Sequence, residues 1–273
     1  MEAFAGAEQI AVTDATPMVS VVIPTLDEER NIAWVLERLP PLVDEIIIVD
    51  GRSTDGTIAA ARAARPDVRM VHELRPGKGA ALRAGFNAAR GDVIVMMDAD
   101  GSMHPAELTR YVALISEGYD LVKGSRFLPG GGTADISRLR AAGNLALLGF
   151  ANRLFCCEFT ELCYGFMALR RSALPRLRLT ADGFEIETQI VASALRESLR
   201  VAEVPSFEAA RRSGVSNLRT FRDGSRVLRE LVRASRLQPL AEIAPEPVTP
   251  LAVGLRAPAA PATVEPAASQ ATP

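Results

Sequence analysis

The sequence is poor in the residues on which metal clusters and disulfide frameworks depend. In 273 residues there are three cysteines, two histidines and one tryptophan. The cysteines, Cys156, Cys157 and Cys163, do not have the spacing of a zinc site, and two histidines are too few to complete one. An odd number of cysteines also argues against a set of disulfides. We therefore expect buried thiols and a reducing, cytoplasmic compartment.

The sequence also lacks long apolar runs and an excess of one charge. No uninterrupted apolar stretch approaches the about 18 residues that a membrane-spanning helix needs. Residues 1–17 do not have the basic start of a signal peptide. The formal net charge of −2 provides no global attraction for nucleic acid. We expect a soluble protein, or one that is attached to a membrane only at its surface.

Composition divides the chain into three parts. Residues 1–17 are expected to form a flexible leader, and residues 18–237 are long enough to bury one sizeable core. Residues 238–273 are rich in Ala and Pro and have no usable periodicity. Such a segment cannot offset the entropy that it loses on ordering, so we predict that it is disordered.

Between these ends, apolar strands alternate with helices. The runs VSVVIPT, EIIIVD and VIVMMD are apolar nearly throughout, as expected for strands that are buried on both faces. The expected strands span 19–25, 45–50, 68–73, 93–98, 119–127, 163–169 and 201–207. The expected helices span 28–39, 57–65, 78–90, 137–155, 184–199 and 218–236. This alternation predicts an α/β fold in which helices cover both faces of a parallel sheet.

Two carboxylates stand one position apart at the end of the expected strand 93–98. Asp98 and Asp100 follow five apolar residues, and Asp50 ends an earlier strand. Ligands bind at the carboxyl ends of parallel strands, so these acids belong to one edge of the sheet. A surface turn, a divalent cation site and a general acid–base pair would each account for Asp98 and Asp100. Their position favours the cation, because unpaired carboxylates are costly there and hard cations prefer carboxylate oxygens.

Six motifs along residues 19–218 extend this interpretation. They are VVIPTLDEERNI, IIIVDGRSTDGT, GKGAALRAGF, GDVIVMMDADGS, KGSRF and SGVSNL. With them the sequence resembles the glycosyltransferase family 2 enzymes, and within that family the polyprenyl-phosphate branch, which is similar to dolichol-phosphate mannosyltransferase. The resemblance implies the Rossmann-like GT-A nucleotide-sugar-binding fold over residues 18–237, with a mostly parallel central sheet and helices on both faces. It also implies a nucleotide-sugar donor and Mg²⁺ or Mn²⁺ as cofactor.

The resemblance further assigns roles to residues near this edge. Asp98 and Asp100 are the expected metal ligands, and Asp98 is also expected near the ribose. The residues expected to enclose the nucleotide or to reach its phosphates are Pro24, Thr25, Glu28, Asp50 and Lys78. Many relatives have a second carboxylate where this chain has Gly51. The identity of the nucleotide base therefore stays open.

A late loop matches the segment that relatives close over the donor diphosphate. In this chain it reads RRSGVSNL and contains Arg211, Arg212 and Ser216. These donors suit a diphosphate, and the sequence does not decide which arginine points inward.

The acceptor is open between a phosphate and a hydroxyl. A phosphate is already ionised near neutral pH and needs cations. Arg126 and Arg140 match the positions where lipid-phosphate relatives bind phosphate, and arginine suits this because its planar fork can bond two oxygens. Arg138 is an equal rival of Arg140, and Asn144 stands where relatives commonly have serine.

A hydroxyl acceptor needs a general base. Glu185 and Glu187 in DGFEIETQI are the candidates, with Glu185 as our first choice. The alternative role of both acids is to offset the dipole of the helix that begins there.

Two helices bear on the location of the acceptor. Residues 218–236 place a stripe of arginines opposite apolar residues, which suits either an anionic membrane surface or an ordinary solvated face. Residues 137–155 repeat apolar side chains at helical spacing, which suits core packing or shallow docking on lipid.

The sequence thus predicts an inverting, metal-dependent hexosyltransferase that moves a sugar from a nucleotide to a polyprenyl phosphate, as in cell envelope glycan biosynthesis. We expect it in the cytoplasm or on the inner face of the cell membrane, with no nucleic acid partner. Two alternatives remain, which are transfer to a hydroxyl of a saccharide or small metabolite, and nucleotide-sugar binding without turnover.

Overall fold

The computed structural model describes residues 16–134, 136–215 and 218–236. The predicted tail, 238–273, and all but the last two residues of the predicted leader, 1–17, lie outside the described residues. No helix among the described residues has the length and apolar character that crossing a bilayer requires.

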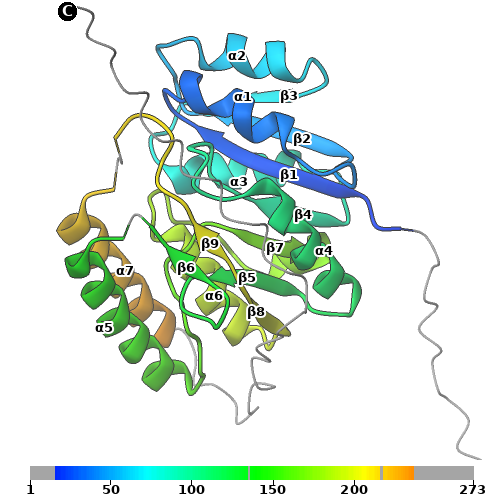
Figure 1. Cartoon of the computed structure of the whole chain (residues 1–273). Coiled ribbons are helices and arrows are strands. Elements are labelled where there is room, and N and C mark those ends of the chain that lie inside the picture. Colours follow the sequence, from blue (N-terminus) through cyan, green and yellow to red (C-terminus); the bar gives the residue numbers. More distant parts are fainter. Residues whose placement is uncertain (1–15, 135, 216–217, 237–273) are drawn as a thin grey trace, which may run out of the picture.

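A seven-stranded sheet forms the centre of the molecule (Figure 1). In spatial order its strands are β3 (Arg69–His72), β2 (Glu45–Asp50), β1 (Val19–Thr25), β4 (Val93–Met96), β7 (Met167–Arg170), β5 (Leu121–Ser125) and β8 (Val201–Pro205). The first four strands are mutually parallel, and β8 is parallel to β5. Only β7, among the described strands of this sheet, runs antiparallel to both neighbours. The predicted α/β fold with a mostly parallel sheet is confirmed.

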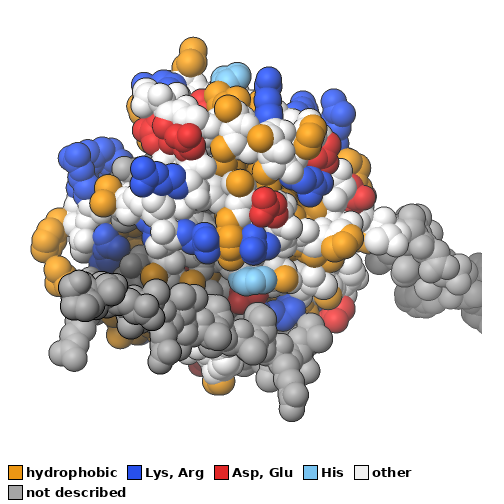
Figure 2. Space-filling view, turned by 45° about the horizontal axis from the view of Figure 1, so that its top comes forward, with side chains coloured by type: hydrophobic (Ala, Val, Ile, Leu, Met, Phe, Trp, Pro, Cys, Tyr) orange, Lys and Arg blue, Asp and Glu red, His pale blue; other side chains and the backbone are white. Residues whose placement is uncertain are grey.

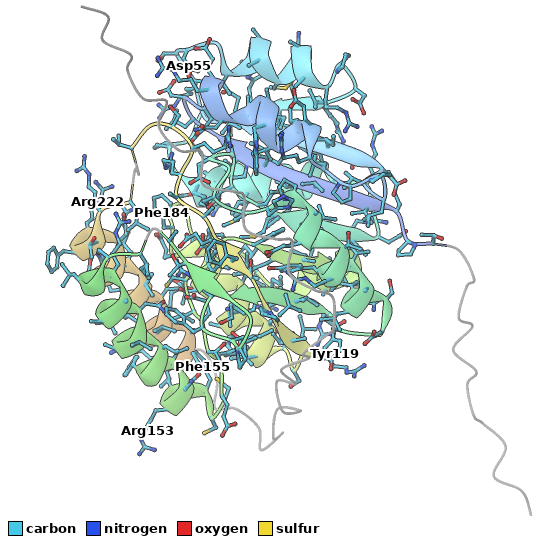
Figure 3. All side chains as sticks on the ribbon, viewed as in Figure 1. Asp55, Tyr119, Arg153, Phe155, Phe184 and Arg222 are labelled. Atoms are coloured by element: carbon cyan, nitrogen blue, oxygen red, sulfur yellow. The ribbon has the colours of Figure 1, made fainter. Side chains whose placement is uncertain are left out.

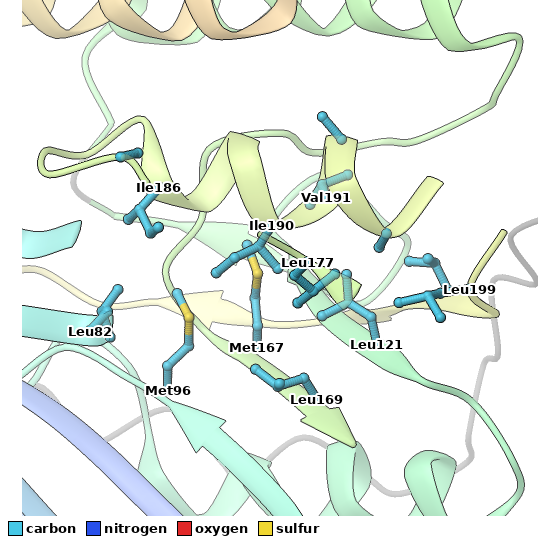
Figure 4. Close-up of a cluster of buried hydrophobic side chains, with 14 of the residues drawn as sticks. Leu82, Met96, Leu121, Met167, Leu169, Leu177, Ile186, Ile190, Val191 and Leu199 are labelled. Carbon is cyan, nitrogen blue, oxygen red and sulfur yellow. The ribbon is translucent and has the colours of Figure 1, made fainter. Parts of the chain in front are cut away.

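The strands are buried on both faces because their successive side chains enter two different cores. In β1, Val21 and Ile23 belong to one core and Val22 to the other. One face is covered by α1 (Glu29–Glu37), α2 (Thr57–Ala64) and α4 (Leu108–Ser116). The other is covered by α3 (Lys78–Ala88) and α6 (Ile186–Arg196). Figure 4 shows this second core, with Ile186 and Ile190 of α6 facing Met167 and Leu169 of β7.

Two further helices lie side by side beyond α6 (Figure 1). These are α5 (Arg138–Phe155) and α7 (Thr220–Arg236), and α7 also packs on α6. Each buries one side: Leu148 and Phe155 of α5, and Val227 and Leu231 of α7, join the core. The opposite sides face outward, and Figure 3 shows Arg153 of α5 and Arg222 of α7 projecting away from the body.

The structure differs from the expected elements in three places. The helix α4 was not expected, and the glycine-rich loop contains the short strand β6 (Gly132–Thr133), which pairs with β9 (Phe207–Glu208). The expected strand 163–169 begins only at Met167 as β7. Two 3₁₀ helices complete the described elements, η1 (Pro105–Glu107) and η2 (Arg171–Arg176).

Parallel pairing brings the loops that carry the expected site residues to one edge of the sheet. Thr25 at the end of β1 pairs with Asp50 at the end of β2, and β4 lies on the other side of β1. On the face drawn in Figure 2, acidic, basic and hydrophobic side chains are interspersed, in keeping with the small net charge.

Candidate active site

A pocket of about 440 Å³ opens at the carboxyl edge of the parallel strands. One part of its lining comes from the turns that follow β1, β2 and β4, and from the start of α3. Another comes from α5 and from the beginning of α7. The pocket therefore joins the parallel half of the sheet to the pair of outer helices.

Asp98 and Asp100 lie in this pocket, and a cation of the chain holds each of them. Lys78 Nζ is 2.5 Å from Asp98 Oδ1, and Arg211 Nη2 is 3.0 Å from Asp100 Oδ2. The other oxygen of Asp100 accepts hydrogen bonds from the backbone N–H and the hydroxyl of Ser102, at 3.0 and 2.8 Å. Each of the two carboxylates thus has one cation of the chain as a partner, although Lys78 and Arg211 each contact a second acid as well.

Lys78 reaches Asp98 because glycines let the start of α3 pack against the backbone before α6. Gly77 has φ +114°, and a Cβ on Gly79 would lie 2.3 Å from the carbonyl oxygen of Ala181. Because Gly79 has no side chain, its backbone N–H can approach the backbone there and donates to the carbonyl oxygen of Asp182 at 2.8 Å. The glycines of the GKG motif therefore serve close backbone packing.

The same packing places Lys78 between two acids. Its Nζ donates to Glu187 Oε1 at 2.7 Å, in addition to the contact with Asp98. Burial favours the neutral amine, but the two carboxylates outweigh it and raise the pKa of Lys78. Burial raises the pKa of Glu187, and Lys78 opposes that rise. Gly165 underlies this group, since a Cβ there would lie 2.6 Å from Lys78 Nζ and 3.1 Å from Asp98 Oδ2.

Arg211 bridges two acids from different parts of the chain. Its Nη1 donates to Glu28 Oε1 at 3.0 Å, while its Nη2 contacts Asp100. Asn31 donates to the second oxygen of Glu28 at 2.5 Å and to the carbonyl of Ser213 at 3.1 Å. Burial raises the pKa of Glu28. These contacts tie the late loop to α1 and to the turn after β4.

The structure distinguishes the two arginines of the late loop. Arg211 lines the pocket, whereas Arg212 is not among the described residues that line it. Ser216 lies outside the described residues.

Pro24, Thr25 and Glu28, from which the sequence predicts contacts with the nucleotide, all line the pocket. Asp50 does not belong to the described lining. Its two oxygens accept backbone N–H groups of Arg52 and Ser53 at 3.2 and 3.3 Å, because the chain turns sharply after β2. In this structure Asp50 therefore holds the turn after β2.

Arg126 lies in the pocket, but four of its five N–H donors are already used. It donates to both oxygens of Glu161 at 2.8 and 3.1 Å, to Glu208 at 2.8 Å and to the carbonyl of Cys163 at 3.1 Å. The side chain of Glu161 is 0% exposed and that of Arg126 is 8% exposed. The phosphate-binding role expected of Arg126 thus competes with a buried network that the sequence analysis did not foresee.

Arg140 and Asn144 are one turn apart on α5, and both line the pocket. Arg140 has no side-chain hydrogen bond or ion pair with the described residues. Asn144 is 7% exposed, and neither of its amide atoms has a hydrogen-bond partner in the described part of the chain. Buried polar atoms are rarely left unpaired, so Asn144 is available to a ligand. Arg138 begins α5, and its side chain lies outside the described part of the structure.

Of the two candidate bases, the structure favours Glu187 over our first choice, Glu185. Glu185 precedes the first turn of α6, and its Oε1 turns back to accept Gly183 N–H at 3.2 Å. Glu185 is not among the described lining residues, whereas Glu187 is. The two acids differ because residues two positions apart on a helix point in different directions.

Glu161 and Glu208 are site residues that sequence reasoning missed. They lie far from Arg126 along the chain, and only the approach of the loop before β7 and of β9 brings them to it. The only local signal was an acid within ELCYGF and within SFEAA, which is too common to single out a site.

The residues present fit a divalent cation. Within the described residues, no group of three or more His, Cys, Asp or Glu could hold a metal by itself. Mg²⁺ in nucleotide sites, however, is bound by one or two carboxylates together with substrate phosphates and waters. Asp98 and Asp100 supply such a pair, are 29% and 13% exposed, and face the pocket while two cations of the chain neutralise them.

Comparison with known proteins shows the family of the chain. The family model described as Glycosyl transferase family 2 matches residues 20–178. Polyprenol monophosphomannose synthase of Mycolicibacterium smegmatis is 33% identical over 224 residues, which cover 77% of this chain and 84% of that protein. Undecaprenyl-phosphate mannosyltransferase of Micrococcus luteus is 33% identical over 212 residues, 73% of this chain and 87% of that protein.

Solved structures give the same result for the fold. Glucosyl-3-phosphoglycerate synthase of Mycobacterium tuberculosis, in complex with Mn²⁺, UDP-glucose and phosphoglyceric acid, superposes with a TM-score of 0.66 at 27% identity. The match covers 82% of this chain and 81% of that chain. The same enzyme has also been solved with Mg²⁺ and UDP, with a TM-score of 0.65 and 26% identity.

We expect Arg126→Gln to destabilise the fold. The change leaves Glu161 buried without its cation, which costs about 3 kcal/mol. Urea unfolding measures the loss. The double variant Arg126→Gln/Glu161→Gln should recover part of it, and Arg140→Gln, which removes the same charge from an unpaired side chain, should unfold like wild type. Wild-type stability of Arg126→Gln would show that the network is dispensable.

Proposed function

The chain belongs to glycosyltransferase family 2, and on that premise we propose that it transfers a hexose from a nucleotide sugar to a polyprenyl phosphate. One observation carries the proposal. A single pocket joins a pair of carboxylates at the sheet edge to an arginine and an unpaired buried amide on α5. The first half suits a nucleoside diphosphate with its cation, and the second suits a phosphate.

In the donor half, Asp98 and Asp100 would hold Mg²⁺ or Mn²⁺. A divalent cation bound there would stabilise the negative charge that develops on the departing diphosphate by several kcal/mol. Arg211, which is 3.0 Å from Asp100 and lines the pocket, is placed to bind the diphosphate oxygens. Lys78 bridges Asp98 and Glu187 in the lining of the pocket.

In the acceptor half, Arg140 and Asn144 would hold the phosphate that attacks the anomeric carbon. An ionised phosphate oxygen needs no general base, and Glu187, the acid that would serve as one, is already bound to Lys78. Attack on the face opposite the departing diphosphate inverts the anomeric carbon. The residues of the chain thus orient the two phosphates and balance their charge.

The pocket continues into a gap between α5 and α7 that suits an isoprenoid chain. Its lining there combines apolar residues and glycines with polar side chains: Ile136, Gly143, Leu147, Gly224 and Val227 lie beside Arg140, Asn144, Thr220 and Asp223. A Cβ at Gly143 or Gly224 would meet nothing within 4 Å, so space is open beside both glycines. An apolar ligand gains free energy when it covers such a lining.

The outer side of the same helices suits a membrane surface. We define the α5–α7 surface by its exposed large hydrophobic side chains, Leu139 (59%), Leu145 (54%), Phe150 (41%), Phe221 (81%) and Leu228 (43%). Arginines of α7, among them Arg222 and Arg229, are exposed beside them. Apolar side chains flanked by arginines match the interface of an anionic bilayer, where each cation adds about 1 kcal/mol of attraction. We therefore place the enzyme on the membrane periphery during transfer.

The transfer reaction is tested by release of nucleoside diphosphate. With Mn²⁺, a nucleotide sugar and a short-chain polyprenyl phosphate, we expect turnover that a chelator abolishes. Asp100→Asn should lower the turnover rate at least about 100-fold, because the cation loses one of its ligands. Asp67→Asn, an exposed acid paired with Arg65, serves as the control.

Other outcomes decide between the alternatives. Turnover only with saccharide or metabolite hydroxyls would replace the proposal with transfer to a hydroxyl. Tight donor binding without turnover would indicate a binding protein, and full activity of Asp100→Asn would overturn the assigned role of the carboxylates.

The acceptor half is tested by Arg140→Gln. Loss of a charge-assisted hydrogen bond should raise the KM for the polyprenyl phosphate about tenfold or more, with the donor KM unchanged. Steady-state kinetics with each substrate varied in turn measures both. Arg153→Gln, at the far end of the same helix, should match wild type. An unaltered acceptor KM in Arg140→Gln would remove Arg140 from the site.

Membrane contact is tested by sedimentation with vesicles of phosphatidylglycerol and phosphatidylcholine. Leu145→Glu/Phe150→Glu should reduce binding at least about tenfold, because two exposed apolar side chains that would enter the bilayer are replaced by anions. Leu74→Glu, an exposed residue outside the α5–α7 surface, should bind as wild type does. If all three proteins sediment equally, the α5–α7 surface does not contact the bilayer.

A further inference from the structure

We propose that stacking of Arg212 on Trp34 positions Arg211 over the carboxylate pair, so that Trp34 and Arg212 are positioning residues for donor binding. The inference rests on the proposed function, since the donor is a nucleotide sugar. It concerns a contact outside the pocket, on the far side of the loop that carries Arg211.

The contact is well defined. The guanidinium carbon of Arg212 lies 4.8 Å from the centroid of the Trp34 ring, within the range of a cation–π interaction. The edge of His104 meets the same ring at 6.0 Å between centroids and 88° between planes. Trp34 therefore lies between α1, which carries it, the turn after β4 and the late loop.

Gly101 shows that this contact is built into the turn that follows Asp100. Gly101 has φ +74°, and a Cβ there would lie 2.5 Å from Arg212 Cδ and 3.3 Å from Trp34 Cε3. Only glycine leaves room for Arg212 to cross the backbone next to Asp100 and reach the indole ring.

The backbone couples the contact to the site. Arg212 N–H donates to the carbonyl of Asp100 at 3.2 Å, and Ala209 N–H donates to that of Ser102 at 2.8 Å. Consecutive side chains then point opposite ways: Arg211 inward to Asp100 and Glu28, and Arg212 outward to Trp34. Fixing the outward side chain fixes the direction of the inward one.

Donor binding affects the contacts of the two arginines differently. When donor and cation bind, Arg211 has to leave Asp100 for the diphosphate. The stack of Arg212 on Trp34 involves no pocket atom, so it can persist while Arg211 moves. Arg211 then moves over a short distance and the loop does not have to be ordered again, which lowers the entropic cost of binding.

The test uses Arg212→Gln, Arg212→Lys and, as a matched control, Arg38→Gln. Arg38 stacks on the same ring at 4.6 Å but directly follows α1, and its other side-chain contacts are with the carbonyl of Trp34 and with Glu37. Each protein is titrated with Mn²⁺ together with GDP or UDP, by calorimetry and by fluorescence of Trp34, which is the only tryptophan in the sequence.

We expect Arg212→Gln to weaken binding of the Mn²⁺–nucleotide complex about two- to fivefold, in line with the cation–π contact of an exposed arginine. Arg212→Lys, which keeps the cation, should restore most of that loss. Arg38→Gln should alter the fluorescence of the free protein but leave the affinity unchanged. In kinetic assays Arg212→Gln should raise the donor KM, whereas simple loss of folded protein would lower kcat alone.

The outcomes separate the two proposals. Wild-type affinity in Arg212→Gln, or equal losses in Arg212→Gln and Arg38→Gln, would overturn the positioning role and leave the proposed function standing. A wild-type protein that binds neither Mn²⁺–nucleotide complex would overturn the proposed function and the positioning role together.

Discussion

The site depends on charge compensation of two carboxylates at the edge of the sheet. Asp98 and Asp100 stand at the end of a fully buried strand, where an unpaired anion is costly. The chain supplies a cation to each, Lys78 from the start of α3 and Arg211 from the late loop. Much of the local packing serves to bring these cations there, including the glycines at 77, 79 and 165. The pocket is the space that remains between them.

The parallel half of this arrangement follows from local sequence. Runs such as EIIIVD are apolar on both faces, as expected for strands of a parallel sheet. In such a sheet the residues that follow the strands lie at one edge. This places Asp98 beside the ends of β1 and β2. The other half depends on contacts between distant segments. Insertion of β7 between β4 and β5, the pairing of Arg126 with Glu161, and the choice of Glu187 over Glu185 have no local signature.

The hydrogen bonds of Arg126 determine which positive charge of the pocket an acceptor phosphate can use. A solitary arginine in KGSRF could bind phosphate, but here four of its five N–H donors are bound to two carboxylates and one carbonyl. Satisfied buried networks stabilise one conformation, and a partner that breaks them must replace every bond. Arg140 carries no such bonds and has the unpaired Asn144 beside it. The cation that is free to act is therefore the one on the outer helix, next to the apolar gap between α5 and α7.

Lys78 and Arg211 are both counterions of the carboxylate pair, but their surroundings differ in burial and packing, and this difference determines which of them can move. Lys78 is 10% exposed, touches two acids and sits in a helix start packed on the backbone at 181–182. Removing it would leave buried anions, so it stays in place when a ligand enters. Arg211 is 20% exposed and lies in a loop that contains Gly214, where φ is +83° and no atom would contact a Cβ. The ion pair of Arg211 with Asp100 is the more exposed one and lies on such a loop, so it is the one that can be exchanged. The anion that replaces Asp100 as the partner of Arg211 must reach the same point in the pocket. A diphosphate that shares a cation with Asp100 meets that condition.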